Sequence, residues 1–148
     1  MPLDLLFRIA STLALAGWVA LALSPLQRPA AVFAARMIAA VLCGGYLAIL
    51  IHALGHGPAP DWRAFNSLDG VMGLLRAREA FLAGWVHYLA FDLFTGAWEA
   101  ETAPASRVPH AVLLICLFLT FMAGPVGLLA YLLVRAGRIN GASPARRR

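Results

Sequence analysis

The segment AGWVHYLAFDLF, residues 83–94, carries three polar side chains, His87, Tyr88 and Asp92, inside a long apolar run. A neutral imidazole can accept a proton, a phenol can donate a hydrogen bond, and a carboxyl group removed from water keeps its proton. Together these groups could perform acid–base chemistry on a ligand. The alternative is structural, since Asp92 or His87 could each form a hydrogen bond that joins two helices.

On a helix with 100° per residue, the polar and aromatic side chains of this region fall on two faces. We expect catalytic groups on the first face and at His87 on the second, and substrate-binding aromatic groups on both faces. Asp92 and Glu99 point the same way, about 10 Å apart along the axis, whereas His87 lies about 140° from Asp92. The first face contains Trp85, Tyr88, Asp92 and Glu99; the second contains His87, Phe91, Phe94 and Trp98.

Three further histidines are candidates for the same chemistry or for a metal. His110 begins a later apolar segment at a depth close to Glu99, so it is as good a proton acceptor as His87. His52 and His56 have the i, i+4 spacing of metal ligands, but the glycines and the proline around His56 favour a loop.

The composition is that of an integral membrane protein. Hydrophobic residues make up 61% of the chain and charged residues 13%, against about half and about a quarter in soluble domains. The net charge of +5 is not arranged as a basic stripe interleaved with aromatic residues, so we expect no nucleic-acid partner.

A helix needs about 20 mostly apolar residues to cross a bilayer. Four segments qualify, so we expect four transmembrane helices in one compact all-α bundle, residues 1–135, followed by a disordered basic tail, residues 136–148. The segments are residues 5–23, 32–53, 79–98 and 110–134.

Four spans would place both termini on one side of the membrane. That side would hold nine of the twelve arginines. Because cytoplasmic loops are enriched in basic residues, we expect both termini to be cytoplasmic.

The motif GPVG, residues 124–127, interrupts the last segment. Pro125 removes a main-chain donor and kinks the helix, and the glycines allow another helix to approach closely. Gly124 and Pro125 are therefore expected to shape a cavity or a tight contact at the substrate-binding site.

Several motifs together resemble one family. The blocks FNSLDGVMGLL (65–75), AGWVHYLAFDLFTGAWE (83–99), PH (109–110) and CLFLTFMAGPVGLLAYLLVR (116–135) are similar to the abscisic-acid-deficient-four-like family. The resemblance covers about residues 5–135. Since the first span begins almost at once, without a plastid-type extension, we expect a bacterial member in the inner membrane.

The resemblance implies carotenoid chemistry, because plant members of the family are associated with neoxanthin synthesis, the opening of an epoxide to an allene without net redox change. It implies roles for His87, Tyr88, Asp92, Gly124 and Pro125. In our hypothesis Asp92, assisted by Tyr88, protonates the oxygen while His87 or His110 accepts a carbon-bound proton. No cofactor is expected; the partners are the bilayer and an apolar isoprenoid or lipid ligand, and the fold is compatible with a homo-oligomer.

Two alternatives stay open. A haem- or metal-binding membrane protein could use His52, His87 and His110 as ligands. A non-catalytic carotenoid- or lipid-binding scaffold would need only the aromatic faces and the kinked fourth helix.

Overall fold

The computed structural model describes residues 2–56 and 61–141 of the 148-residue chain. The all-helical fold predicted from the sequence is confirmed. The described elements are α1 (Leu3–Ala22), α2 (Arg28–His56), the 3-10 helix η1 (Trp62–Asn66), α3 (Leu68–Leu74), α4 (Arg78–Thr102) and α5 (His110–Gly141).

Side chains fix where the short elements begin. Asp61 accepts a hydrogen bond from the main-chain nitrogen of Arg63 at 2.9 Å, and Ser67 accepts one from Gly70 at 3.1 Å. Both are N-cap contacts, which satisfy donors that the first helical turn leaves free. These caps stabilise the first turns of η1 and α3.

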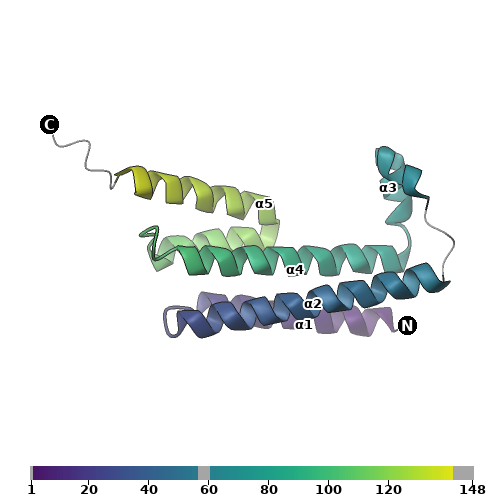
Figure 1. Ribbon diagram of the computed structural model, residues 1–148, viewed down its shortest axis with the longest axis horizontal. Helices are drawn as coiled ribbons and strands as arrows, with labels where there is room; N and C mark the ends of the chain where they lie inside the picture. The colour runs from purple at the N-terminus through teal and green to yellow at the C-terminus, as the bar shows by residue number, and fades with distance from the viewer. Residues whose placement is uncertain (1, 57–60, 142–148) are drawn as a thin grey trace.

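Helices α1, α2 and α4 pack side by side, and α4 lies between the α1–α2 pair and α5 (Figure 1). Small residues at their interfaces allow these helices to approach one another closely. In a membrane, lipid provides no hydrophobic driving force for helix association, so close van der Waals packing between helices is what stabilises it. The buried small residues include Ala10, Ala14, Ala35, Ala39, Ala83, Ala90, Ala97 and Ala100.

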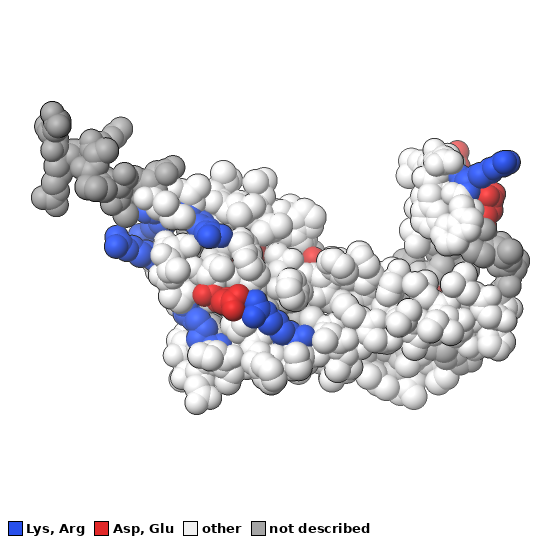
Figure 2. Space-filling view, in the orientation of Figure 1, with Lys and Arg blue, Asp and Glu red and all other residues white. Residues whose placement is uncertain are grey.

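Three helices, α1, α2 and α5, are long and apolar enough to cross a membrane, so the chain is a membrane protein. On the face seen in Figure 2, most of the charged side chains lie toward the two ends of the molecule, and the surface between them is mostly uncharged. Helix α4 is not in this group, and it carries five charged residues, namely Arg78, Glu79, Asp92, Glu99 and Glu101.

Helix α5 is bent back on itself. At Ala123 the backbone leaves the helical region, with φ −155° and ψ 71°, and the second half returns beside the first (Figure 1). Contacts with α4 confirm the reversal: Phe121 meets Tyr88, whereas Tyr131, ten residues later, meets Thr102 near the far end of α4. An unbroken helix would have carried Tyr131 in the opposite direction.

The prediction of four continuous spans is therefore not confirmed. The segment predicted at 110–134 is helical, and α5 continues to Gly141, into the region expected to be tail; residues 142–148 lie outside the described part. The last helical residues lie at the end of the molecule opposite to the N-terminus (Figure 1), so the shared side predicted for the termini is not confirmed either.

Candidate membrane-embedded acid site

The first face of α4 points at α1 and at the bend of α5. Trp85 donates a hydrogen bond from Nε1 to Ser11 Oγ of α1 at 3.1 Å. Tyr88 and Asp92 follow one and two turns later and meet α5. The helical spacing that grouped these residues in the sequence thus directs them to one side of α4.

Tyr88 provides a hydrogen-bond partner for a main-chain carbonyl group at the bend of α5. Pro125 has no N–H, so the carbonyl of Phe121, four residues earlier, loses its helical partner. The Tyr88 hydroxyl donates to this carbonyl at 3.0 Å. An unsatisfied carbonyl in hydrocarbon costs several kcal/mol, so this bond stabilises the bend.

Asp92 lies directly against the backbone of the bend. A Cβ placed on Gly124 would collide with the Asp92 carboxyl group, so only glycine permits this contact. Asp92 is half-buried, and its Oδ2 atom is buried without a hydrogen-bond partner among the described residues. The structure therefore holds a carboxyl oxygen at the bend, inside a largely apolar surrounding.

Glu99 is fully buried beneath the same bend. It accepts a hydrogen bond from Thr120 Oγ1 at 2.9 Å. Gly127, in the returning half of α5, packs so closely on Thr120 that a Cβ there would collide with its main chain and its hydroxyl. Glu99, Thr120 and Gly127 thus fasten both halves of α5 to α4.

The second face of α4 points elsewhere. His87 stacks on Phe91 with ring centroids 4.5 Å apart and lies 5.8 Å from the Tyr46 ring of α2. The rings of Phe91 and Phe94 are exposed. His87 therefore lies on a different face of α4 from Asp92, as the helical geometry predicted; this face meets α2, and His87 does not join the bend.

The other histidines are spread along the molecule. His110 bonds through Nε2 to the carbonyl of Ala22, 3.1 Å away, at the end of α1. His52 lies near the end of α2, where its carbonyl contacts His56 Nδ1 at 3.0 Å. Within residues 2–56 and 61–141, no three His, Cys, Asp or Glu side chains are grouped as a metal would require. The structure does not bring His52, His87 and His110 together.

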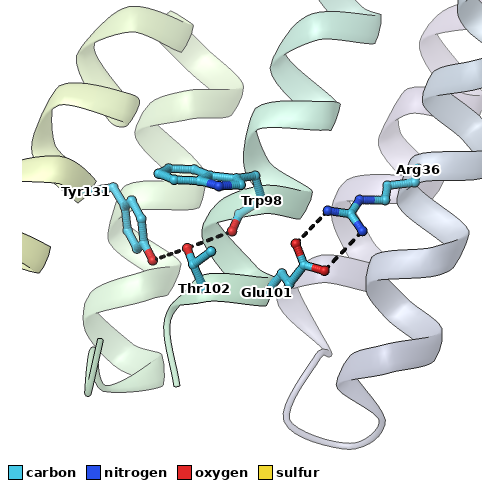
Figure 3. A network of polar contacts seen from close by, with 5 residues as sticks. All are labelled: Arg36, Trp98, Glu101, Thr102 and Tyr131. Atoms are coloured by element: carbon cyan, nitrogen blue, oxygen red, sulfur yellow. Dashed lines mark hydrogen bonds and ion pairs between the residues drawn. The ribbon is translucent and has the colours of Figure 1, made fainter. Parts of the chain in front are cut away.

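Some polar partners were missed by the sequence reasoning. Thr120 is the clearest, since a hydroxyl buried in an apolar span indicates a partner on another helix. A second network lies near the end of α4 (Figure 3): Thr102 Oγ1 lies 2.6 Å from the Tyr131 hydroxyl and 2.8 Å from the carbonyl of Trp98. It anchors the returning half of α5.

Arg36 and Glu101 form a two-pronged ion pair between α2 and α4, with N–O distances of 3.1 and 2.6 Å (Figure 3). The Arg36 guanidinium also lies over the Phe94 ring, 5.9 Å from its centroid. The pair ties the two helices together and neutralises two of the charges on this apolar surface.

Comparison with known proteins identifies the class. A model of the ABA DEFICIENT 4-like family matches residues 5–131, most of the chain, so this protein belongs to that family. The resemblance found in the sequence motifs is thereby confirmed. No curated protein and no solved structure matches the chain.

Proposed function

We propose that this protein is a membrane enzyme that acts on a carotenoid or a related isoprenoid, opening an epoxide to an allene. Membership of the ABA DEFICIENT 4-like family supports this proposal, because plant relatives are associated with neoxanthin synthesis. The observation that carries it is the Asp92 carboxyl group seated against the Gly124 backbone, beside Tyr88. A carboxyl group held away from water is suited to donate a proton.

The proposed reaction balances without a redox partner. Asp92 gives its proton to the epoxide oxygen while the C–O bond nearest the polyene breaks. A vinylic hydrogen leaves as a proton, and its bonding electrons complete the allene. One proton is added and one is lost, so the product is an isomer with a new hydroxyl group.

The proton acceptor must lie near Asp92. His110 is bonded to Ala22 at the end of α1, and His87 faces Tyr46 on α2. We therefore propose the second carboxyl oxygen of Asp92, Oδ2, as the acceptor, which leaves the enzyme unchanged after each turnover. Tyr88 and Glu99 then act as positioning residues, since both hold the α5 bend against Asp92.

The proposal includes an arrangement in the bilayer. Helices α1, α2, α4 and α5 form one bundle, and α4 keeps its acids away from lipid by turning Asp92 and Glu99 toward α5. Helix α5 enters and returns, as broken helices do where their free backbone is buried in protein. The N-terminus and the end of α5 then lie on opposite sides of the membrane, rather than both in the cytoplasm.

The proposed function can be tested by incubating membranes that contain the protein with epoxy- and hydroxy-carotenoids. Pigment chromatography then measures the conversion. We expect an allenic product from the native chain and none from Asp92→Asn. Asp69→Asn, an exposed residue of α3, is the matched control and should retain activity. Binding of the pigment without its conversion would indicate a binding scaffold rather than an enzyme.

His87→Ala tests whether Asp92 Oδ2, as proposed, or His87 accepts the proton. If Asp92 acts alone, conversion by His87→Ala should stay within about threefold of the native rate, since a lost general base costs 10²–10⁴-fold. A roughly 10²–10⁴-fold loss of conversion in His87→Ala would show that His87 is the proton acceptor.

A further inference from the structure

We propose that η1 and α3 together form an interfacial element, the η1–α3 hairpin (residues 61–75), which lies on the bilayer surface and inserts its apolar face among the lipids. Its partner is the boundary between the headgroups and the acyl chains of a phospholipid bilayer. The position of the hairpin rests on the bilayer arrangement proposed above for the long helices, and it does not depend on the chemistry at Asp92.

The hairpin is a folded unit with a defined shape. Gly70 of α3 packs so closely on the main chain of Ala64 in η1 that a Cβ there would collide with it. Asp61 and Ser67 cap the two helices. Of the described helices, η1 is the one that packs against α3 over most of its length. The long helices therefore leave most of the surface of the hairpin uncovered.

One face of α3 is apolar and exposed. Leu68, Met72 and Leu75 have the spacing i, i+4 and i+7, so they share a face, whereas Asp69 and Gly73 lie on a different one. The exposed fractions of Leu68 and Met72 are 77% and 51%. Such separation of apolar and polar faces is typical of helices that lie in a membrane interface.

Helix η1 adds two aromatic side chains to this exposed apolar surface. The rings of Trp62 and Phe65 stack with their centroids 6.2 Å apart, and both are exposed. Tryptophan is enriched where a membrane meets water, because its ring is apolar and its N–H group can donate to a polar group nearby. A cluster of large apolar side chains on a short element indicates an interaction surface.

The direction of α3 fits this partner. The long helices run along the long axis of the molecule, whereas α3 stands across that axis, at the end where α1 begins and α2 ends (Figure 1). When the long helices cross the bilayer, α3 therefore lies parallel to the membrane plane. The ends of α1 and α2 place it at the level of the interface.

The two sides of the hairpin also fit this orientation. At this end of the molecule, most of the charged side chains in view lie on the outer side, and the side toward the middle of the molecule is uncharged (Figure 2). The outer side would meet water and headgroups, and the inner side would meet acyl chains. Arg63 and Arg76, at the two ends of the hairpin, are exposed and can donate hydrogen bonds to lipid phosphates.

An interfacial hairpin would fix the depth of α4 in the membrane. Helix α4 begins at Arg78, directly after the hairpin, and Asp92 lies 14 positions later, about 21 Å along the helix axis. Because the hydrocarbon layer is about 30 Å thick, the hairpin would hold Asp92 within it.

Single spin labels in liposomes test the position of the hairpin, with Cys43 and Cys116 substituted. Oxygen concentrates in hydrocarbon and a nickel chelate stays in water, so the ratio of their collision rates with the label reports its depth. Labels at Leu68→Cys and Met72→Cys should lie about 5–10 Å into the headgroup–acyl boundary. Labels at Asp69→Cys and Gly73→Cys, the matched controls on the other face, should collide mainly with the chelate.

Equal access of the chelate to all four labels would overturn the proposal, because the hairpin would then stand in water. Protection of the Leu68 and Met72 labels from both reagents would overturn it as well, since protein would cover the apolar face. Dipolar coupling between labels would identify that protein as a second copy of the chain. A label at Val41→Cys, exposed near the middle of α2, should collide mainly with oxygen; chelate access there would refute the bilayer arrangement itself.

Discussion

The hydroxyl group of Tyr88 donates to the main-chain carbonyl of Phe121, the carbonyl that Pro125 deprives of its helical partner. One side chain of α4 thus replaces the hydrogen bond that a proline of α5 removes. The hydrogen bond from Tyr88 stabilises the sharp bend of α5. Asp92, one turn further along α4, contacts the bend at Gly124.

Tyr88→Phe should destabilise the protein by about 1–3 kcal/mol, because the Phe121 carbonyl would remain buried without a partner. Thermal unfolding in detergent measures the change. Tyr46→Phe is the control: Tyr46 packs against His87, and no side-chain hydrogen bond is described for it. Equal melting temperatures for the two variants would contradict the role assigned to Tyr88.

Gly124→Ala should abolish conversion while leaving the protein folded, since the added Cβ would displace the Asp92 carboxyl group. Gly137→Ala adds the same atom to the same helix where nothing lies within 4 Å, and should leave activity unchanged. Pigment chromatography of both variants checks the prediction. An active Gly124→Ala would show that the contact with Asp92 is not needed.

Thr120→Val should lower the free energy of unfolding by about 1–3 kcal/mol, because it removes the hydroxyl group that donates to the buried Glu99 while keeping the side chain's shape. Thr12→Val, on an exposed face of α1, is the matched control. Chemical or thermal denaturation distinguishes them. Indistinguishable stabilities would mean that Glu99 finds another partner.

Spin labels can detect the reversal of α5 directly. Labels at cysteines replacing Pro104 and Ala136, with Cys43 and Cys116 substituted, should lie close together, because Tyr131 contacts Thr102. In an unbroken helix His110 and Ala136, which are 26 positions apart, would be separated by about 39 Å. A distance near that value would show that α5 crosses the membrane as one helix.

The sequence was sufficient for the helices and for the two faces of α4. Hydropathy located the four long helices, of which α1, α2 and α5 are apolar enough to cross a membrane, and helical periodicity placed Tyr88 and Asp92 on a face separate from His87. Both signals are local, since they depend only on residues within one helix.

What the sequence left undetermined depends on contacts between helices. Pro125 indicated a kink, but its size is set by where Gly124 meets Asp92 and Gly127 meets Thr120. His110 was expected at a depth close to Glu99, but the sequence could not indicate its partner, which is the carbonyl of Ala22 in α1. Such directions follow from tertiary structure alone.

The bend also constrains how the protein is made. The first half of α5, His110–Met122, is about 20 Å long, too short to cross the roughly 30 Å of hydrocarbon by itself. The Phe121 carbonyl and the Thr120 hydroxyl have their partners on α4. In the arrangement proposed above, α4 must therefore be in the bilayer before α5 enters it, and synthesis from the N-terminus supplies the two helices in that order.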